Sequence, residues 1–323
     1  MAAPDFGQEG AIMAELYFCV FSDYHYWPGH YPIGTDGMAK IMKDAHERGA
    51  TLAVQCGDLA HNAPAAMELM RLYIGNPYGI RTLNCLGNHE VEAVDSLESV
   101  LACYGMKNNY EYHDVDGFRL ILLDTNYYNV DGQLFHNPPR SHSAPNGDGD
   151  YLPPEQLTWL RDTVMSSPYP CLLFSHASFE KPVGCKDAPA VRDLIREANA
   201  LHPGRVLMCI NGHYHRNHIT VEDDVVFFDV NAVYNGHWQA KQHNGFSEAF
   251  AASARMAANV CLFKEPAHAF VRVNSNGAID IEGMETSYLF DVSPEKLGTD
   301  TTNAFGRKCE PRISNLHRDA MKE

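Results

Sequence analysis

The sequence predicts an α/β fold, because short apolar segments alternate with longer amphipathic segments along most of the chain. The apolar segments, such as residues 15–23 and 51–58, have the length and composition of buried strands. The amphipathic segments, such as residues 35–50, carry apolar residues at the spacing of one helix face. Strands that are separated by helices in this way indicate βαβ units.

The individual elements follow this alternation in chain order. Strands are predicted at 15–23, 51–58, 81–90, 118–126, 171–178, 205–215, 224–234 and 268–284, and helices at 35–50, 64–74, 92–105, 153–167 and 191–201. Thr35 is a predicted N-cap. The last two strand segments are predicted to be antiparallel, the second as a hairpin that turns at residues 275–277. Residues 127–151 are predicted to form a long polar loop, which inside a domain is usually functional or disordered.

The charge balance disfavours polyanionic partners. The 323 residues carry a formal net charge of −16, which repels nucleic acid and anionic membranes at long range. A bound cation would suit this balance. No apolar run approaches the length of a membrane helix, which is about 20 residues. The first residues lack the basic region of a signal peptide. We therefore expect neither a nucleic-acid partner nor a membrane partner.

The nine cysteines are predicted to be reduced and structural. Their number is odd, and no CxxC or cysteine-rich zinc pattern occurs. Cys19, Cys56, Cys85, Cys171 and Cys209 lie within apolar segments, where free cysteine behaves as a small hydrophobic residue. This usage is typical of a reducing compartment, so a cytoplasmic location is expected.

Polar residues that bind metals follow five of the predicted strands. In open α/β folds the carboxyl ends of the strands face one crevice, so these side chains are expected to meet there. Asp and His suit Mn, Fe and Zn ions, and two ions about 3.5–4 Å apart are typical of phosphoryl-transfer sites. The residues are Asp23 and His25 in FSDYH, Asp58 in QCGD, Asn88 and His89 in LGNHE, His176 in FSHAS, and His213 and His215 in NGHYH.

The segment GNHE also permits a structural interpretation, since Gly and Asn are common in turns. Glu90 is interpreted as a helix-start residue that the helix dipole favours, rather than as a ligand. The glycines that precede Asp58, Asn88 and His213 would let the backbone bend tightly beside a ligand.

The five motifs DYH, GD, GNHE, H and GHYH, in this order, resemble those of the calcineurin-like metallophosphoesterase family over roughly residues 15–285. The resemblance implies a four-layer αββα sandwich of mixed sheets flanked by helices, with two divalent or trivalent metal ions (Mn, Fe or Zn). It implies that one ion is held by Asp23, His25, Asp58 and His215, and the other by Asp58, Asn88, His176 and His213. A hydroxide that bridges the ions would attack phosphorus, and His89 would act as general acid on the leaving oxygen.

On this basis we divide the chain into three parts. Residues 1–13 are expected to be an N-terminal leader, and residues 14–290 the metallophosphoesterase catalytic domain. Residues 291–323, which are largely polar, are expected to be a C-terminal arm or tail.

The second motif departs from the protein Ser/Thr phosphatases of this family, which extend it as G-D-x-x-D-R-G. Here the segment is GDLAHNA, so His61 replaces a carboxylate and Asn62 replaces the arginine that would clamp a phosphomonoester dianion. His61 is interpreted as a helix cap or as a neighbour that orients a metal ligand. Placement of His61 beside the first metal or the phosphate is the alternative.

Other polar and aromatic residues near the motifs allow two interpretations each. Arg216, directly after GHYH, is either a substrate contact or part of a surface salt bridge. Tyr24, Trp27 and Tyr127 either wall the pocket, which would suit a nucleotide-like or aryl substrate, or pack in the core.

The predicted function is hydrolysis of a small phosphodiester or diphosphate, such as a cyclic nucleotide, a nucleotide diphosphate conjugate or a glycerophosphodiester. A diester is favoured because no arginine clamp is evident and His89 can protonate an alkoxide leaving group. The alternative is a phosphomonoesterase with the same site, which two or more arginines pointing into the cleft would favour. A non-catalytic metal-binding scaffold is disfavoured because every motif is present.

Overall fold

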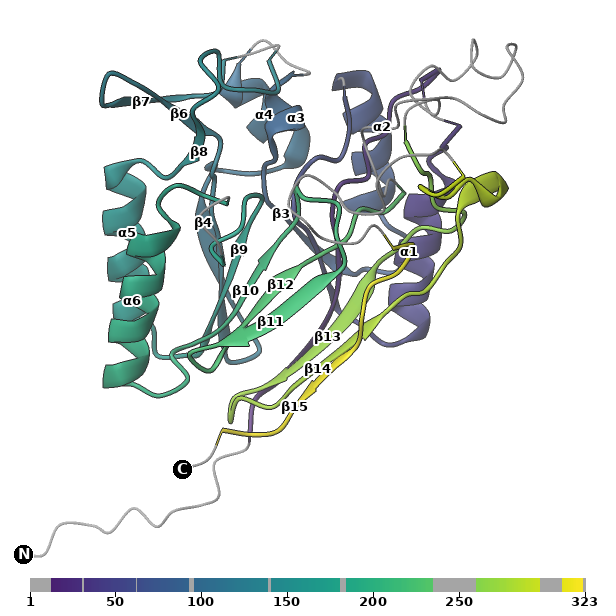
Figure 1. Cartoon of the computed structure of the whole chain (residues 1–323). Coiled ribbons are helices and arrows are strands. Elements are labelled where there is room, and N and C mark those ends of the chain that lie inside the picture. The colour runs from purple at the N-terminus through teal and green to yellow at the C-terminus, as the bar shows by residue number, and fades with distance from the viewer. Residues whose placement is uncertain are drawn as a thin grey trace, which may run out of the picture.

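Two mixed sheets, packed face to face and covered by helices on their outer faces, form the centre of the molecule (Figure 1). The computed structural model describes residues 13–30, 32–61, 63–92, 96–138, 141–180, 184–234, 260–296 and 310–321. Each central sheet has six strands. This arrangement is the four-layer αββα sandwich that the sequence predicts.

The first sheet carries three of the predicted parallel strands. These are β1 (Glu15–Phe21), β2 (Leu52–Gln55) and β3 (Arg81–Asn84). On the other side of β1 the sheet continues antiparallel with β13 (Ala269–Asn274), β14 (Ile279–Gly283) and β15 (Leu316–Arg318). Helices α1 (Asp36–Glu47) and α2 (Ala63–Tyr73) cover its outer face (Figure 1).

The second sheet has a parallel centre with an antiparallel strand at each edge. Its order is β11 (His218–Glu222), β12 (Val225–Asp229), β10 (Val206–Asn211), β9 (Cys171–Ser175), β5 (Phe118–Leu122) and β4 (Glu111–Val115). Only β11 and β4 are antiparallel to their neighbours. Helices α5 (Pro154–Met165) and α6 (Ala188–Leu201) cover its outer face (Figure 1).

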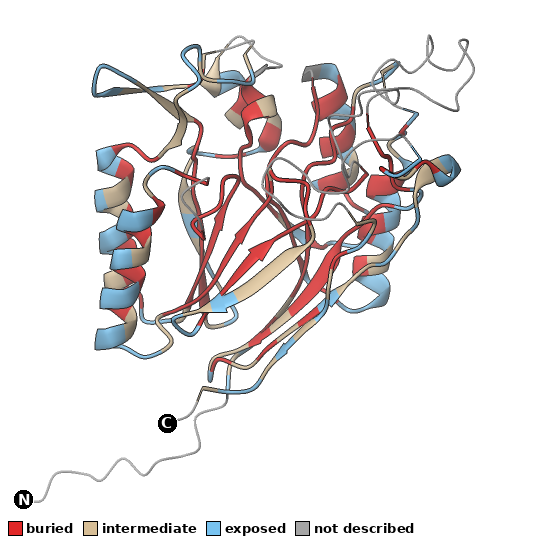
Figure 2. Ribbon diagram, in the orientation of Figure 1, coloured by how far each residue is buried: buried red, intermediate tan, exposed pale blue. Residues whose placement is uncertain are grey.

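A continuous apolar core lies between the two sheets. Phe18 and Val20 of β1 face this core, where the Phe18 ring packs edge-on against Phe174 of β9 at a centroid distance of 5.9 Å. The intervening residues Cys19 and Phe21 pack against the helices on the outer face. Because the central strands are buried on both faces (Figure 2), their sequences are uninterrupted apolar runs.

Residues 127–151 contain a small third sheet, where the sequence predicts only a loop. Its strands are β6 (Tyr127–Val130), β7 (Gln133–His136) and β8 (Gly149–Tyr151), in the order β7-β6-β8. Each strand is short and none of its residues is buried. The alternation of apolar and polar residues that identifies a strand is therefore absent from the sequence.

The strands that the sequence does not indicate lie at the edges of the central sheets, namely β4, β11 and β15. β11 and β12 form a hairpin through Asp223 and Asp224, whose φ values of 51° and 59° suit a type I′ turn. The segment 224–234 is thus antiparallel to β11 but parallel to β10. The prediction that this segment is an antiparallel strand is therefore wrong in part. β15 lies in the predicted C-terminal arm and pairs with β14.

Two local predictions also differ from the structure, and one is confirmed. Thr35 occupies the N-cap position of α1, but its side chain makes no capping hydrogen bond. The predicted strand 81–90 ends at Asn84, and its last residues begin the short helix α3 (Asn88–Glu92), which α4 (Leu97–Tyr104) follows. The predicted hairpin turn is present, with the Gly277 N–H donating to the carbonyl of Asn274 at 2.8 Å.

The cysteines and the helices can be compared with the predictions of reduced thiols and of no membrane helix. All eight cysteines in the described ranges are free thiols, and the five predicted to be core residues are buried. None of the helices in these ranges has the length and hydrophobicity that crossing a bilayer requires.

Candidate metal centre

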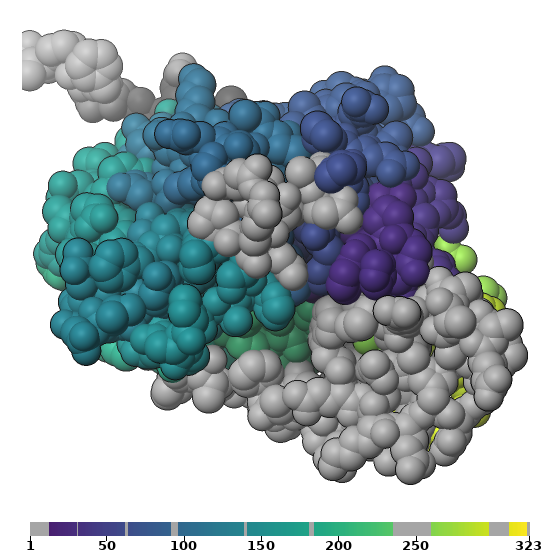
Figure 3. Space-filling model, turned by 90° about the horizontal axis from the view of Figure 1, so that it is seen from above, coloured from purple at the N-terminus to yellow at the C-terminus, as the bar shows by residue number. Residues whose placement is uncertain are grey.

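The carboxyl ends of β1, β2, β3, β9 and β10 deliver the predicted ligands to one place, at the upper end of the sandwich in Figure 1. Figure 3 views this end, where purple residues that follow β1 border dark blue residues that follow β2. The side chains come from turns rather than from the strands themselves. The predicted convergence therefore arises from the parallel order of the strands.

Left-handed backbone conformations direct most of these side chains. A positive φ is uncommon for residues other than glycine and often marks functional sites. The residues are Asp23, His25, Asp58, His213 and His215, with φ between 47° and 73°.

Two glycines allow the turns to approach one another closely. A Cβ on Gly57 would lie 2.3 Å from Nδ1 of His176. A Cβ on Gly87 would lie 2.3 Å from Oδ1 of Asp58. Both distances are too short for a side chain, so only glycine permits this packing of the turns, as the sequence predicts.

One group of potential ligands comprises Asp23, His25 and His215. Nε2 of His215 lies 3.2 Å from Oδ1 of Asp23 and 3.0 Å from Nε2 of His25. Oδ2 of Asp58 lies 3.6 Å from the same nitrogen of His25. Acceptor atoms thus converge on one point, as the ligands of a cation do.

The second group comprises Asp58, His176 and His213. Nε2 of His176 lies 3.1 Å from Oδ2 of Asp58 and 3.1 Å from Nδ1 of His213. Nδ1 of His176 lies 2.7 Å from the carbonyl oxygen of Cys56, which fixes the orientation of the ring. Because Oδ2 of Asp58 contacts both groups, this one oxygen lies between them.

Asn88 lies beside the second group, and only the nitrogen of its side-chain amide is hydrogen-bonded to the described residues. Its Nδ2 donates to the backbone carbonyl of His142 at 2.7 Å. Its Oδ1 is buried and accepts no hydrogen bond from the described residues, and the same holds for Oδ1 of Asp23. Buried acceptors without donors are costly, and a cation at each group would satisfy them. The residues therefore fit a pair of metal ions.

Burial and mutual charge shift the pKa values of this cluster. Burial raises the pKa of Asp58, but His176 and other histidines outweigh it and hold the pKa well below its usual range. Burial lowers the pKa of His176, but Asp58 outweighs it and raises the pKa to about 10. Burial holds the pKa of His25 well below its usual range. Metal binding would displace the proton from His176, as it does for imidazole ligands in general.

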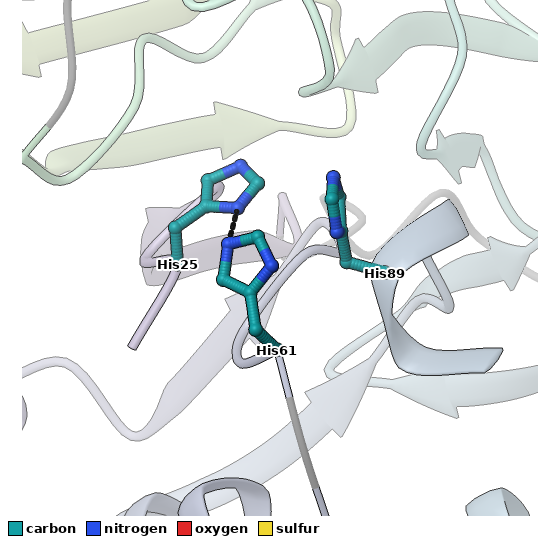
Figure 4. Close-up of side chains that lie close together, drawn as sticks. All are labelled: His25, His61 and His89. Carbon is teal, nitrogen blue, oxygen red and sulfur yellow. Dashed lines mark hydrogen bonds between the residues drawn. The ribbon is translucent and has the colours of Figure 1, made fainter. Parts of the chain in front are cut away.

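His89 and His61 lie beside the first group, as Figure 4 shows together with His25. Nε2 of His61 is 2.9 Å from Nδ1 of His25, the ring nitrogen opposite the one that faces His215. His25, His61 and His89 also have the spacing of metal ligands. The structure therefore permits both interpretations of His61, as a residue that orients a ligand and as one beside the first metal. His89 lies at the start of α3, with its ring edge-on to His25 and His61, and its backbone N–H donates to Asp58.

Glu90 ties two of the ligand turns together, which the sequence does not reveal. It stands in the first turn of α3, as predicted, but its buried carboxylate accepts hydrogen bonds from the backbone N–H groups of Asp58, Leu59 and Gly87. Burial and the nearby Asp58 raise the pKa of Glu90 to about 7. The carboxylate therefore positions the turn that carries Asp58.

Arg216 is buried, which excludes the surface salt bridge that the sequence allows. Its side chain is 1% exposed, so it forms no surface salt bridge. The guanidinium pairs with Asp229 and lies 3.5 Å from Oε2 of Glu180, while Nε2 of His218 lies 2.9 Å from Glu180. Glu180, His218 and Asp229 also have the spacing of metal ligands. Since Arg216 supplies a positive charge there, we interpret this cluster as a buried ion-pair network.

The aromatic candidates divide between the core and the site. Tyr24 is fully buried and its hydroxyl donates to the carbonyl of Gly34, so it packs in the core. Trp27 stacks on His61 with ring centroids 4.6 Å apart, which places it beside the first group. Tyr127 lies on β6, where its hydroxyl accepts from Asn109. Asn62 lies outside the described residues.

Two residues of the segment 127–151 also reach the site, although no local pattern in the sequence identifies them. His142 stacks on His89, with centroids 5.0 Å apart and an interplanar angle of 5°. Oδ2 of Asp150 lies 4.0 Å from Nε2 of His213. The only signal in the sequence was the unusual length of this polar segment.

Asp124, just after β5, anchors the small sheet. Its Oδ2 lies 2.9 Å from Nε2 of His136 on β7 and accepts from Asn109 at 2.7 Å. Burial lowers the pKa of His136, but Asp124 outweighs it, so the net pKa is raised. Burial raises the pKa of Asp124, but His136 outweighs it, so the net pKa is lowered.

We expect His136→Gln to reduce the stability of the protein by about 1–3 kcal/mol near neutral pH, because Asp124 loses a charged partner. The raised pKa means that the contribution of His136 is complete below its ordinary pKa of 6.5 and is lost as the pH rises through its folded value. Thermal unfolding of both proteins should therefore differ more at about pH 6 than at about pH 9. A difference that grows with pH would show that the pair does not act in this way.

Comparisons with known proteins agree with this geometry. A family model described as calcineurin-like phosphoesterase matches residues 16–217. No curated protein is similar enough in sequence to count as a match. Among solved structures, a dimetal phosphatase from Danio rerio has a TM-score of 0.56 and 14% identity, covering 84% of this chain and 98% of that chain. GAP50, described as the anchor in the inner membrane complex of Plasmodium, has a TM-score of 0.56 and 12% identity, covering 96% and 90%.

The two structural likenesses establish the shared fold, and the family model establishes the lineage because it spans more than half of the chain. The ordered motifs and the two groups of ligand-type side chains lie within or beside the matched region. The chain belongs to the calcineurin-like phosphoesterase family and is a metallophosphoesterase, a hydrolase of phosphoric esters.

Proposed function

We propose that the protein uses two metal ions to hydrolyse small phosphodiesters or diphosphates. The observation that carries this proposal is the position of Asp58, whose Oδ2 contacts both groups of ligand-type side chains. A carboxylate that is shared in this way favours two ions close together, the arrangement that clamps the attacking and leaving oxygens of a phosphoryl group.

The proposed ligands follow the two groups. Asp23, His25, Asp58 and His215 would hold one ion, and Asp58, Asn88, His176 and His213 would hold the other. Mixed imidazole, carboxylate and amide donors suit Mn, Fe or Zn ions, in divalent or trivalent form. The contact of His61 with His25 and that of Cys56 with His176 would orient the ligand rings.

The chemistry combines the ions with a proton donor. The bound ions would polarise the phosphoryl oxygens and lower the pKa of the attacking water. His89 would protonate the leaving oxygen as general acid. Its ring lies 4.9 Å from that of His25, within reach of a substrate at the ions, and its backbone N–H holds Asp58. Trp27 stacks on His61 and would line the substrate site beside His61.

A diester or diphosphate is proposed because the described residues offer no arginine clamp at the site. The guanidinium of Arg216 is committed to Asp229 and Glu180 rather than to the groups of ligands. A monoester dianion would need such a clamp more than a monoanionic diester does. The free buried thiols support a reducing, cytoplasmic location as part of this proposal.

The proposal is tested by hydrolysis of bis(p-nitrophenyl) phosphate and p-nitrophenyl phosphate by the Mn²⁺-loaded protein. We expect a higher kcat/KM for the diester. A preference for the monoester would establish the phosphomonoesterase instead, and turnover of neither compound by metal-loaded protein would favour a metal-binding scaffold.

A further inference from the structure

A cavity of about 220 Å³ opens beside the second group of ligands. Asn88 and His213, two of the proposed ligands, belong to its lining. Asn137, His142, Ser143 and Asp150 line the rest together with small residues of the same segment. The metal centre and the segment that the sequence leaves unassigned therefore share one cavity.

The cavity lies on the side of the site where His89 would donate a proton. The ring of His142 lines the cavity and stacks on the ring of His89. The backbone of His142 is fixed in turn, because its carbonyl accepts from Asn88. A group that leaves with the oxygen protonated by His89 would therefore enter this cavity.

The lining carries one carboxylate beside amide, imidazole and hydroxyl groups. Asp150 contributes the carboxylate, and no lysine or arginine is found among the described residues of the lining. A second phosphate would meet the negative charge of Asp150, whereas hydroxyl groups would donate to its carboxylate.

The size of the cavity limits its occupant. At about 30 Å³ per molecule of liquid water, it holds about seven water-sized groups. Pockets for larger organic ligands measure about 300–1,000 Å³. A glycerol-sized alcohol fits within this volume.

The backbone of the lining segment is held in place, as recognition of hydroxyl groups requires. Asp150 lies on β8 with a left-handed φ of 67°, and its carbonyl accepts from the N–H of Lys186 at 2.8 Å. Asn137 directly follows β7, where the backbone N–H of Asn137 donates to the carbonyl of Asn126 at 2.7 Å. His136 and Asp124 anchor the same strand to the central sheet.

We propose that this cavity binds the leaving alcohol and selects a small, uncharged, hydroxyl-bearing group of the glyceryl type, with the carboxylate of Asp150 accepting its hydroxyl hydrogens. This inference rests on the proposed phosphodiesterase function. The oxygen of water bonds to phosphorus while the bond to the alcohol oxygen breaks. His89 gives its proton to that oxygen, and the proton released by water replaces it.

The test compares two diesters that differ only in the hydroxyl groups of the alcohol. The Mn²⁺-loaded protein is assayed with glyceryl methyl phosphate and propyl methyl phosphate, and methyl phosphate is quantified by phosphorus NMR. We expect kcat/KM to be at least about tenfold higher for the glyceryl ester, since the propyl ester leaves the carboxylate of Asp150 without a donor. Asp150→Ala should reduce that ratio towards one.

Asp148→Ala is the matched control, because Asp148 stands on the same segment but binds the hydroxyl of Tyr151 and does not line the cavity. This variant should keep the wild-type ratio. Bis(p-nitrophenyl) phosphate is assayed in parallel and reports on the phosphodiesterase function by itself. If the protein hydrolyses that diester but shows no preference for the glyceryl ester, or hydrolyses neither alkyl ester, the inference about the cavity is overturned while the proposed function stands.

Discussion

Asp58→Asn is expected to abolish binding of the metal pair and hydrolysis together. Oδ2 of Asp58 lies between His25 and His176, which belong to different groups of ligands. An amide lacks the negative charge that would hold two cations beside these rings. Since loss of a mere neighbour of a ligand already costs about 10–100-fold in metal affinity or activity, loss of the shared ligand should exceed that range.

Isothermal titration with Mn²⁺ and hydrolysis of bis(p-nitrophenyl) phosphate measure the two effects. Asp44→Asn is the matched control, because Asp44 pairs with His268 on the outer layer as Asp58 pairs with His176 in the site. The control should bind two ions like the wild type. Two-ion binding by Asp58→Asn would remove the bridging role from this residue.

His89→Ala is expected to retain both metal ions and to slow hydrolysis according to the leaving group. General acid catalysis contributes about 10²–10⁴-fold when the leaving alkoxide is basic. Nitrophenolate leaves without a proton, so its esters should lose much less. His89 lies outside the two groups that Asp58 joins, but with His25 and His61 it has the spacing of metal ligands, so metal content must be measured together with turnover.

The measurement is kcat/KM for an alkyl diester and for bis(p-nitrophenyl) phosphate, with metal content determined on the same samples. An equal loss on both substrates would rule out the general-acid role. Loss of a metal ion would instead assign the residue to the binding of the ions.

The fold and most of the site were predictable because each depends on a strong local pattern. Strands such as β1 are buried on both faces, so Phe18 and Phe21 belong to one unbroken apolar run. The ligands follow such strands directly, and parallel order brings their ends together. Asp58 and His176, far apart in sequence, thus meet at 3.1 Å.

The remaining features depend on tertiary contacts that leave no local pattern. The half-exposed strands of the small sheet have no periodic sequence, so His142 and Asp150 were not connected with the site. Glu90 was predicted from its place at the start of a helix, but its bonds reach the turn of Asp58, remote in the sequence. The sequence leaves Arg216 as either a substrate contact or part of a surface salt bridge, because Asp229 and Glu180, its buried partners, lie on other segments.

Two metal ions are proposed to act together in one site. This is tested by adding Mn²⁺ stepwise to metal-free protein and recording turnover of bis(p-nitrophenyl) phosphate against the number of ions bound. We predict that turnover appears only with the second equivalent. Full turnover after one equivalent, or none after two, would contradict it.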